Sequence, residues 1–199
     1  MNIPKLGPLT PRRGNILTRA IGRVLLAVYR WQVIGEMHNA PKLILILAPH
    51  TSLWDLYTPN ATMMAVGFRS SWLVAAVLSF WPLSLFIRWS DGIIVHRSSS
   101  HHLVSQVVKE FNDNDSLVLT LSPEGKLSKV IKWKTGFWHI ASQAGVPIQL
   151  VSLDYGKRAT EFGPVIETSD SIEADMEQIQ NYYKTVQAKH PDQFGGEYL

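Results

Sequence analysis

The chain has 199 residues, a length typical of one domain and sufficient to bury a hydrophobic core without disulfides. Hydrophobic residues make up 46% and charged residues 18% of the chain, which excludes an intrinsically disordered protein. Cysteine is absent, which excludes disulfides, thiolate metal sites and a cysteine nucleophile, and suits a reducing compartment.

Charge is strongly polarised along the chain, although the formal net charge is only +3. Residues 1–35 carry six basic residues and no acid, whereas residues 161–199 carry eight acids and two lysines. A basic N-terminal arm points to an anionic partner, namely a nucleic acid, a membrane surface or an acidic carrier protein. Nucleic acid is disfavoured, because the chain has no nucleic-acid-binding motif and its basic residues are not interleaved with aromatic ones.

Residues 15–31 have the pattern of an amphipathic helix. Apolar residues recur at helical spacing, and three arginines fall on the opposite face. The apolar set is Leu17, Ile21, Val24, Val28 and Trp31, and the basic set is Arg19, Arg23 and Arg30. The arginines argue against a spanning helix, which needs about 20 apolar residues. The helix either lies in a membrane interface or packs on its own domain, and the pattern favours neither.

A second apolar stretch covers residues 70–87 and is interrupted by Pro82. A buried strand followed by a short helix, or a monotopic membrane patch, fits this stretch better than a membrane span. Several of the seven tryptophans lie in or beside the two apolar segments. Their positions, Trp31, Trp72, Trp81 and Trp89, are typical of a lipid interface, although a packed core also uses tryptophan.

Strands and helices alternate in the rest of the chain. Apolar runs predict strands at 42–48, 92–96, 116–121 and 147–153. Helical spacing predicts helices at 52–66, 99–112, 137–144 and 170–189. Most of these strands are apolar on both faces, as in sheets covered by helices on both sides. The sequence therefore predicts a single-domain α/β sandwich with a largely parallel mixed sheet flanked by helices, plus an N-terminal amphipathic helix.

The common nucleotide and hydrolase motifs are missing. The glycines form neither G-x-G-x-x-G nor a P-loop, and no G-x-S-x-G elbow occurs. The adjacent His101 and His102 at a predicted helix start are typical of solvated histidines, and we expect no metal site.

His50 and Asp55 lie directly after a predicted strand, where α/β folds place their functional residues. A histidine with a pKa of about 6.5 suits general-base catalysis, and a carboxylate can orient its ring. The alternative is that Asp55 caps a helix beside an ordinary loop histidine, and on spacing alone this is the commoner arrangement.

Two further segments follow predicted strands. One strand leads to Arg97, which on its own is more typical of a surface arginine than of an anion ligand. The other precedes Glu124 and Gly125, after which four lysines occur within nine residues (Lys126, Lys129, Lys132, Lys134). A glycine turn with clustered lysines is a candidate anion site, and a solvated basic loop is the alternative.

Four short motifs follow one another along the chain. They are His-x-x-x-x-Asp at 50–55, a glycine-led strand ending in arginine at 92–97, Pro-Glu-Gly at 123–125 with Lys-x-Gly-Phe at 134–137, and Val-Pro-Ile at 146–148. Together they resemble the glycerolipid acyltransferases typified by 1-acylglycerol-3-phosphate acyltransferase. The resemblance covers about residues 40–160 and implies direct acyl transfer to a hydroxyl of a lysophospholipid, a step of phospholipid biosynthesis.

The resemblance also implies roles for single residues. His50 would take the proton from the acceptor hydroxyl as it attacks a thioester, with Asp55 orienting His50. The acceptor head group would be held by Arg97, Glu124, Gly125, Lys126 and Lys129. The donor would be acyl-CoA or acyl carrier protein, and no metal or redox cofactor is implied.

The same resemblance implies a peripheral or monotopic enzyme on the cytoplasmic face of a membrane. We expect a basic N-terminal arm at 1–35 and an acyltransferase-like domain at 36–199. One departure concerns the acceptor, because Leu127 stands where the family usually has arginine, and lysine does not replace a bidentate arginine. A phosphate-free lysolipid acceptor, or a non-catalytic lipid-binding protein, is therefore the alternative.

Overall fold

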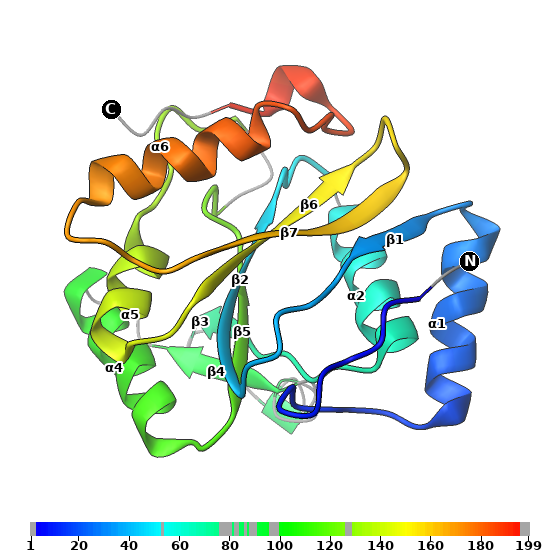
Figure 1. Cartoon of the computed structure of the whole chain (residues 1–199), viewed down its shortest axis with the longest axis horizontal. Coiled ribbons are helices and arrows are strands. Elements are labelled where there is room, and N and C mark those ends of the chain that lie inside the picture. Colours follow the sequence, from blue (N-terminus) through cyan, green and yellow to red (C-terminus); the bar gives the residue numbers. More distant parts are fainter. Residues whose placement is uncertain are drawn as a thin grey trace.

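A five-stranded sheet in the order β1-β7-β6-β2-β5 forms the centre of the computed structural model (Figure 1). The structure describes residues 3–52, 54–75, 81, 84–85, 87, 91–95, 100–125 and 129–195. The strands are β1 (Gln32–Gly35), β2 (Lys42–Ala48), β5 (Leu117–Leu121), β6 (Ile148–Asp154) and β7 (Ala159–Ile166). Strand β2 pairs in parallel with both β5 and β6, whereas β7 runs antiparallel to β6.

Two more strands form a separate two-stranded sheet. Strands β3 (Trp72–Ala75) and β4 (Gly92–Val95) pair in parallel, and an isolated parallel bridge between Ser71, just before β3, and Leu119 of β5 connects the two sheets. Because β2 is parallel to β5 and β6, the carboxyl ends of these three strands lie along one edge of the five-stranded sheet. The predicted largely parallel mixed sheet is confirmed.

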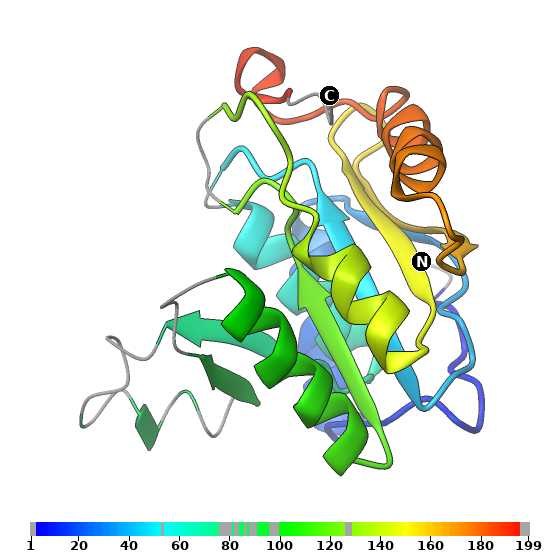
Figure 2. The same ribbon diagram turned by 90° about the vertical axis from the view of Figure 1, so that its left-hand side faces the viewer.

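Helices cover both faces of the sheet (Figures 1 and 2). Helices α4 (Ser100–Asp113), α5 (Gly136–Ala144) and α6 (Ile172–Tyr183) cover one face, and α2 (Trp54–Val66) covers the other. Strand β2 shows why both faces need a cover, because Ile44 and Ile46 are buried in one core and Leu43 and Leu45 in the other. A strand that is apolar on both sides must be covered on both faces to keep its side chains from solvent.

Helix α1 (Ile16–Val28) packs on α2 through a different face from the predicted apolar stripe. Asn15 caps the helix, since its side chain accepts the N–H of Thr18 at 3.0 Å. Leu26 is fully buried, and Gly22 approaches α2 so closely that an added Cβ would lie 2.4 Å from the backbone nitrogen of Ala65. The predicted stripe points outward, with Leu17 67%, Val24 61% and Val28 70% exposed.

Trp31 belongs to the core and does not face a lipid interface. It is 4% exposed, and its indole N–H donates to Thr160 Oγ1 at 2.9 Å. Trp72 and Trp81, by contrast, are exposed, and Trp89 lies outside the described residues. Within the described ranges, no helix combines the length and the hydropathy needed to cross a bilayer.

Most predicted elements are present within one or two residues of their predicted ends. The predicted helix 170–189 was too long, because α6 ends at Tyr183 and the following chain makes tertiary contacts instead. Among these, the carbonyl of Gln187 accepts the N–H of Tyr155 at 2.9 Å. Strands β1 and β7 were not predicted.

Candidate active site

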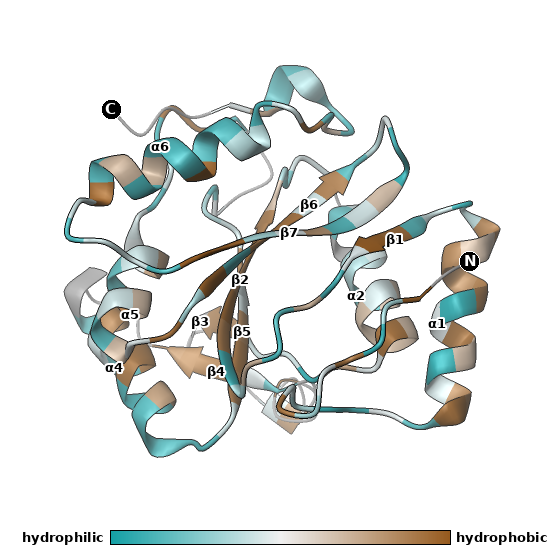
Figure 3. Cartoon of the chain, in the orientation of Figure 1, coloured by the Kyte–Doolittle hydropathy of each residue, from teal (hydrophilic) through white to brown (hydrophobic). Residues whose placement is uncertain are grey.

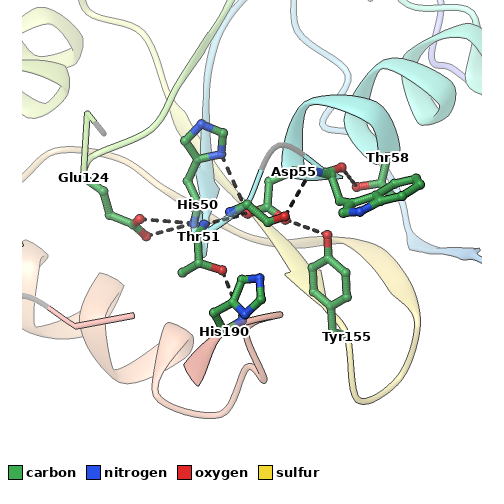
Figure 4. Close-up of polar contacts among 9 residues, drawn as sticks. His50, Thr51, Asp55, Thr58, Glu124, Tyr155 and His190 are labelled. Carbon is green, nitrogen blue, oxygen red and sulfur yellow. Dashed lines mark hydrogen bonds and ion pairs between the residues drawn. The ribbon is translucent and has the colours of Figure 1, made fainter. Parts of the chain in front are cut away.

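His50 lies in the loop between β2 and α2, and Asp55 lies in the first turn of α2. Strand β2 is flanked on one side by β5 and on the other by β6. Loops at the carboxyl ends of parallel strands diverge where the chain order reverses, which is where α/β folds bind ligands. The loops after β2, β5 and β6 supply His50, Glu124 and Tyr155 respectively, and Figure 4 shows them around one centre.

The Asp55 carboxylate is fully buried and holds the loop in shape. Its Oδ2 accepts the backbone N–H groups of Thr51 at 2.6 Å and Ser52 at 2.7 Å, and its Oδ1 accepts the hydroxyl of Tyr155 at 2.6 Å. Asp55 therefore caps α2, because it accepts backbone N–H groups just before the helix, as the alternative interpretation of this residue predicted. It also faces the histidine, so the two interpretations of this residue are compatible.

His50 directs its Nδ1 at the Asp55 carboxylate. The distance from Nδ1 to Oδ2 is 4.0 Å, and the two side chains are 16% and 0% exposed. Nδ1 is buried and has no hydrogen-bond partner in the part of the chain that the structure describes. Burial lowers the pKa of His50 below 6.5, and the Asp55 charge opposes this only in part. The ring is therefore neutral at pH 7 and available as a base.

Glu124 supports the same loop from the other side (Figure 4). Its side chain is 3% exposed, and its two oxygens accept the backbone N–H of His50 at 3.0 and 3.1 Å. Burial raises the pKa of Glu124 to about 7; the His50 N–H lowers it, and the Asp55 charge raises it further. The carboxylate thus holds the backbone of the histidine in this structure.

The remaining predicted residues are placed as follows. Gly125 is exposed and has a φ of 67°, a conformation that favours glycine, in the turn after Glu124. Lys129 is exposed and is not among the polar contacts of His50 or Asp55 that the structure describes. Arg97 and Lys126 lie outside the described residues. The structure therefore brings together His50, Asp55 and Glu124, with Gly125 beside them.

A family model matches the part of the chain that contains these residues. The model for the family described as "Acyltransferase" matches residues 30–154, which include the loops that carry His50, Glu124 and Gly125. The chain belongs to the acyltransferase family. The resemblance seen in the four sequence motifs is thereby confirmed.

A solved structure agrees with this acyltransferase assignment at the level of the fold. The chain is similar to the 1-acyl-sn-glycerophosphate (LPA) acyltransferase PlsC from Thermotoga maritima, with a TM-score of 0.59 and 16% identity. The match covers 87% of this chain and 80% of that chain. No functionally curated protein matches the sequence.

Sequence reasoning missed two components of this candidate site. Tyr155 follows β6 directly, so the rule that selected the other loops would also have selected it. The segment after α6 was taken as helix, yet it lies along the loop, where the N–H of His190 donates to Thr51 Oγ1 at 3.3 Å. Beside it, Lys189 Nζ lies 4.6 Å from the ring centroid of Trp54.

The carboxylates of this site bind protein donors. Among the described residues, no group of three or more histidine, aspartate or glutamate side chains is arranged to hold a metal ion. The oxygens of Asp55 and Glu124 are engaged by N–H and O–H donors, which is the geometry of carboxylates that orient a loop.

Proposed function

We propose that the protein is a membrane-associated O-acyltransferase that moves a fatty acyl group from acyl-CoA or acyl carrier protein to a lysophospholipid hydroxyl. The observation that carries the proposal is the pairing of His50 with buried Asp55 at the carboxyl edge of the sheet, in a member of the acyltransferase family. The fold shared with a 1-acyl-sn-glycerophosphate acyltransferase supports 1-acylglycerol-3-phosphate as the acceptor to test first.

In the proposed reaction His50 acts as a general base through its second ring nitrogen, Nε2. The acceptor oxygen attacks the thioester carbonyl carbon while its proton passes to Nε2, and a tetrahedral oxyanion forms. Collapse of this intermediate breaks the C–S bond, and His50 returns the proton to the thiolate. Asp55 stabilises the imidazolium between these steps. No protein nucleophile, metal or redox cofactor takes part.

The test is acyl transfer by the wild type and by His50→Ala, measured with acyl-CoA and acyl carrier protein donors. We expect His50→Ala to lose the transfer activity, because the substitution removes the proposed general base, and to keep its fold. His38→Ala is the matched control, since His38 is exposed, and it should keep wild-type activity. Full activity in folded His50→Ala would refute the mechanism.

We assign binding of the acceptor head group to the turn at Glu124 and Gly125 and to the basic residues Arg97, Lys126 and Lys129. Transfer to lysolipids that differ only in a phosphate tests this assignment. A strict phosphate requirement would support it. Equal transfer to phosphate-free lysolipids would favour the acceptor class suggested by Leu127, and lipid binding without turnover would favour a non-catalytic protein.

The outward stripe of α1 supports membrane association. Leu17, Val24 and Val28 are mostly exposed, and α1 lies at the rim of the molecule, where Figure 3 shows hydrophobic and hydrophilic segments alternating along it. Arg23 and Arg30 of the same segment are exposed as well, and exposed basic residues suit an anionic lipid surface. We assign the protein to the cytoplasmic face, because a chain without cysteine suits a reducing compartment.

Point variants test this surface better than removal of the arm, because Leu26 and Trp31 belong to the core. We expect Leu17→Asp combined with Val24→Asp to lose most binding to anionic vesicles without loss of stability. Each single variant, Leu17→Asp or Val24→Asp, is also compared with Ile131→Asp, which places the same single charge on a 94% exposed apolar residue outside α1. Unchanged binding by the α1 variant, or equal loss in the control, would contradict the assignment.

A further inference from the structure

Tyr155 is the one side-chain donor to the Asp55 carboxylate that the described residues supply. The other two donors, the N–H groups of Thr51 and Ser52, belong to the loop itself and both bond Oδ2. Tyr155 comes from the end of β6 and bonds the opposite oxygen, Oδ1, at 2.6 Å. Figure 4 shows its hydroxyl directed at Asp55 from the side away from Glu124.

The Tyr155 ring is held in place independently of Asp55. Its backbone N–H donates to the carbonyl of Gln187 at 2.9 Å. Its ring packs edge-on against Trp31 with centroids 4.9 Å apart, and Trp31 is itself fixed by its bond to Thr160. Burial, together with the bond to Asp55, raises the pKa of Tyr155 far above 10, so the hydroxyl keeps its proton and remains a donor.

We propose that Tyr155 is a positioning residue of the acyl-transfer reaction, which acts by holding Asp55 Oδ1 so that Oδ2 faces His50 Nδ1. An aspartate carboxylate can rotate about its Cβ–Cγ bond. Hydrogen bonds from the loop to Oδ2 and from Tyr155 to Oδ1 prevent this rotation. The proposal rests on the proposed function, since it needs His50 as the base.

The position of His50 makes this orientation important. Nδ1 lies 4.0 Å from Oδ2, so a rotation of the carboxylate decides whether the two groups close to hydrogen-bond distance when substrate binds. Catalytic hydrogen bonds are commonly long before substrate arrives and tighten in the complex. Displacing a reacting group by about 1 Å can cost about 100-fold in rate.

Tyr155→Phe tests the proposal, because it keeps the ring and its packing on Trp31. We expect kcat to fall about 10- to 100-fold with KM changed less than about twofold. We also expect the acid limb of the kcat/KM profile to move to lower pH. Without the hydroxyl, Oδ2 is no longer held toward His50, so the Asp55 charge opposes the effect of burial less and the pKa of His50 falls. A purely structural loss would lower the amount of folded enzyme and leave that limb in place.

Tyr182→Phe is the matched control. The Tyr182 hydroxyl donates to Ser152 of β6 at 3.3 Å and is not bonded to Asp55. The pH profile of this variant should therefore stay as in the wild type. A second variant, fluorinated tyrosine at 155, keeps ring and hydroxyl and donates more strongly. It still holds Asp55 Oδ1, so its kcat should stay as in the wild type, and a loss as large as that of Tyr155→Phe would contradict the positioning role.

Two results would overturn the role of Tyr155: kcat within about twofold of the wild type for Tyr155→Phe, or an acid limb that Tyr155→Phe does not move. Failure of the underlying function looks different. In that case His50→Ala itself would keep its activity, whatever the behaviour of Tyr155.

Discussion

Replacing Glu124 by glutamine removes a buried carboxylate and keeps an oxygen that can accept the N–H of His50. Burial is the main reason why the pKa of Glu124 rises from 4.5 to about 7. The folded protein therefore holds this proton more tightly than the unfolded chain does. Glu124 contributes stability at low pH, and this contribution is lost as the pH rises through about 7.

The size of the effect follows from the shift. One pKa unit corresponds to about 1.4 kcal/mol, so a rise from 4.5 to about 7 amounts to about 3 kcal/mol. Glutamine does not titrate in this range. The free energy of unfolding of Glu124→Gln minus that of the wild type should increase by about 3 kcal/mol between pH 4.5 and pH 8, so the variant becomes relatively more stable. Any constant cost of the substitution cancels in this comparison.

Urea unfolding at pH values from 4.5 to 8 measures this difference for the wild type and Glu124→Gln. Glu177→Gln makes the same chemical change on an exposed residue of α6 and should give a difference that is nearly independent of pH. The reasoning is refuted if the difference for Glu124→Gln is equally flat, because the carboxylate would then not be held in a buried site.

Three further predictions concern the base and the packing. The kcat/KM profile should lose activity below pH 6.5, because burial lowers the pKa of His50; an acid limb above 6.5 would contradict this assignment. Gly22→Ala should destabilise the protein by about 1–3 kcal/mol in urea unfolding, because the added Cβ meets the backbone of α2; a stabilised variant would show α1 to be loosely packed. Tyr183→Phe should cost about 1–3 kcal/mol by the same assay, since its buried hydroxyl bonds the carbonyl of Ile46 at 2.6 Å; an unchanged midpoint would contradict this.

The central strands and the flanking helices could be predicted because their patterns are local. The predicted strand 42–48 coincides with β2, and Gly145 ends α5 in the left-handed conformation, with a φ of 63°. Strand β7 escaped prediction because Glu161, Gly163 and Pro164 interrupt its apolar pattern. Strand β1 has only four residues, which is too short for a periodic signal.

The arm shows where a periodic pattern is ambiguous. Residues 15–31 predicted an amphipathic helix but did not favour packing or exposure. In the structure both occur on different faces: Gly22 and Leu26 pack on α2, and the more apolar stripe is left outside. A helix needs little apolar area to pack when a glycine allows close approach. The division into an arm at 1–35 and a domain at 36–199 stays a prediction.

The sequence by itself determined the class of fold and, through motifs in family order, selected His50, Asp55 and Glu124 as candidate site residues. These follow from residue spacing within single loops and from runs of apolar residues. Only the tertiary structure decided which groups form hydrogen bonds with the Asp55 and Glu124 carboxylates. Tyr155 reaches Asp55 across 100 positions, and Glu124 reaches His50 across 74, because β6 and β5 flank β2 in the sheet. Strand order is set by packing of the whole chain, so no local pattern carries these contacts.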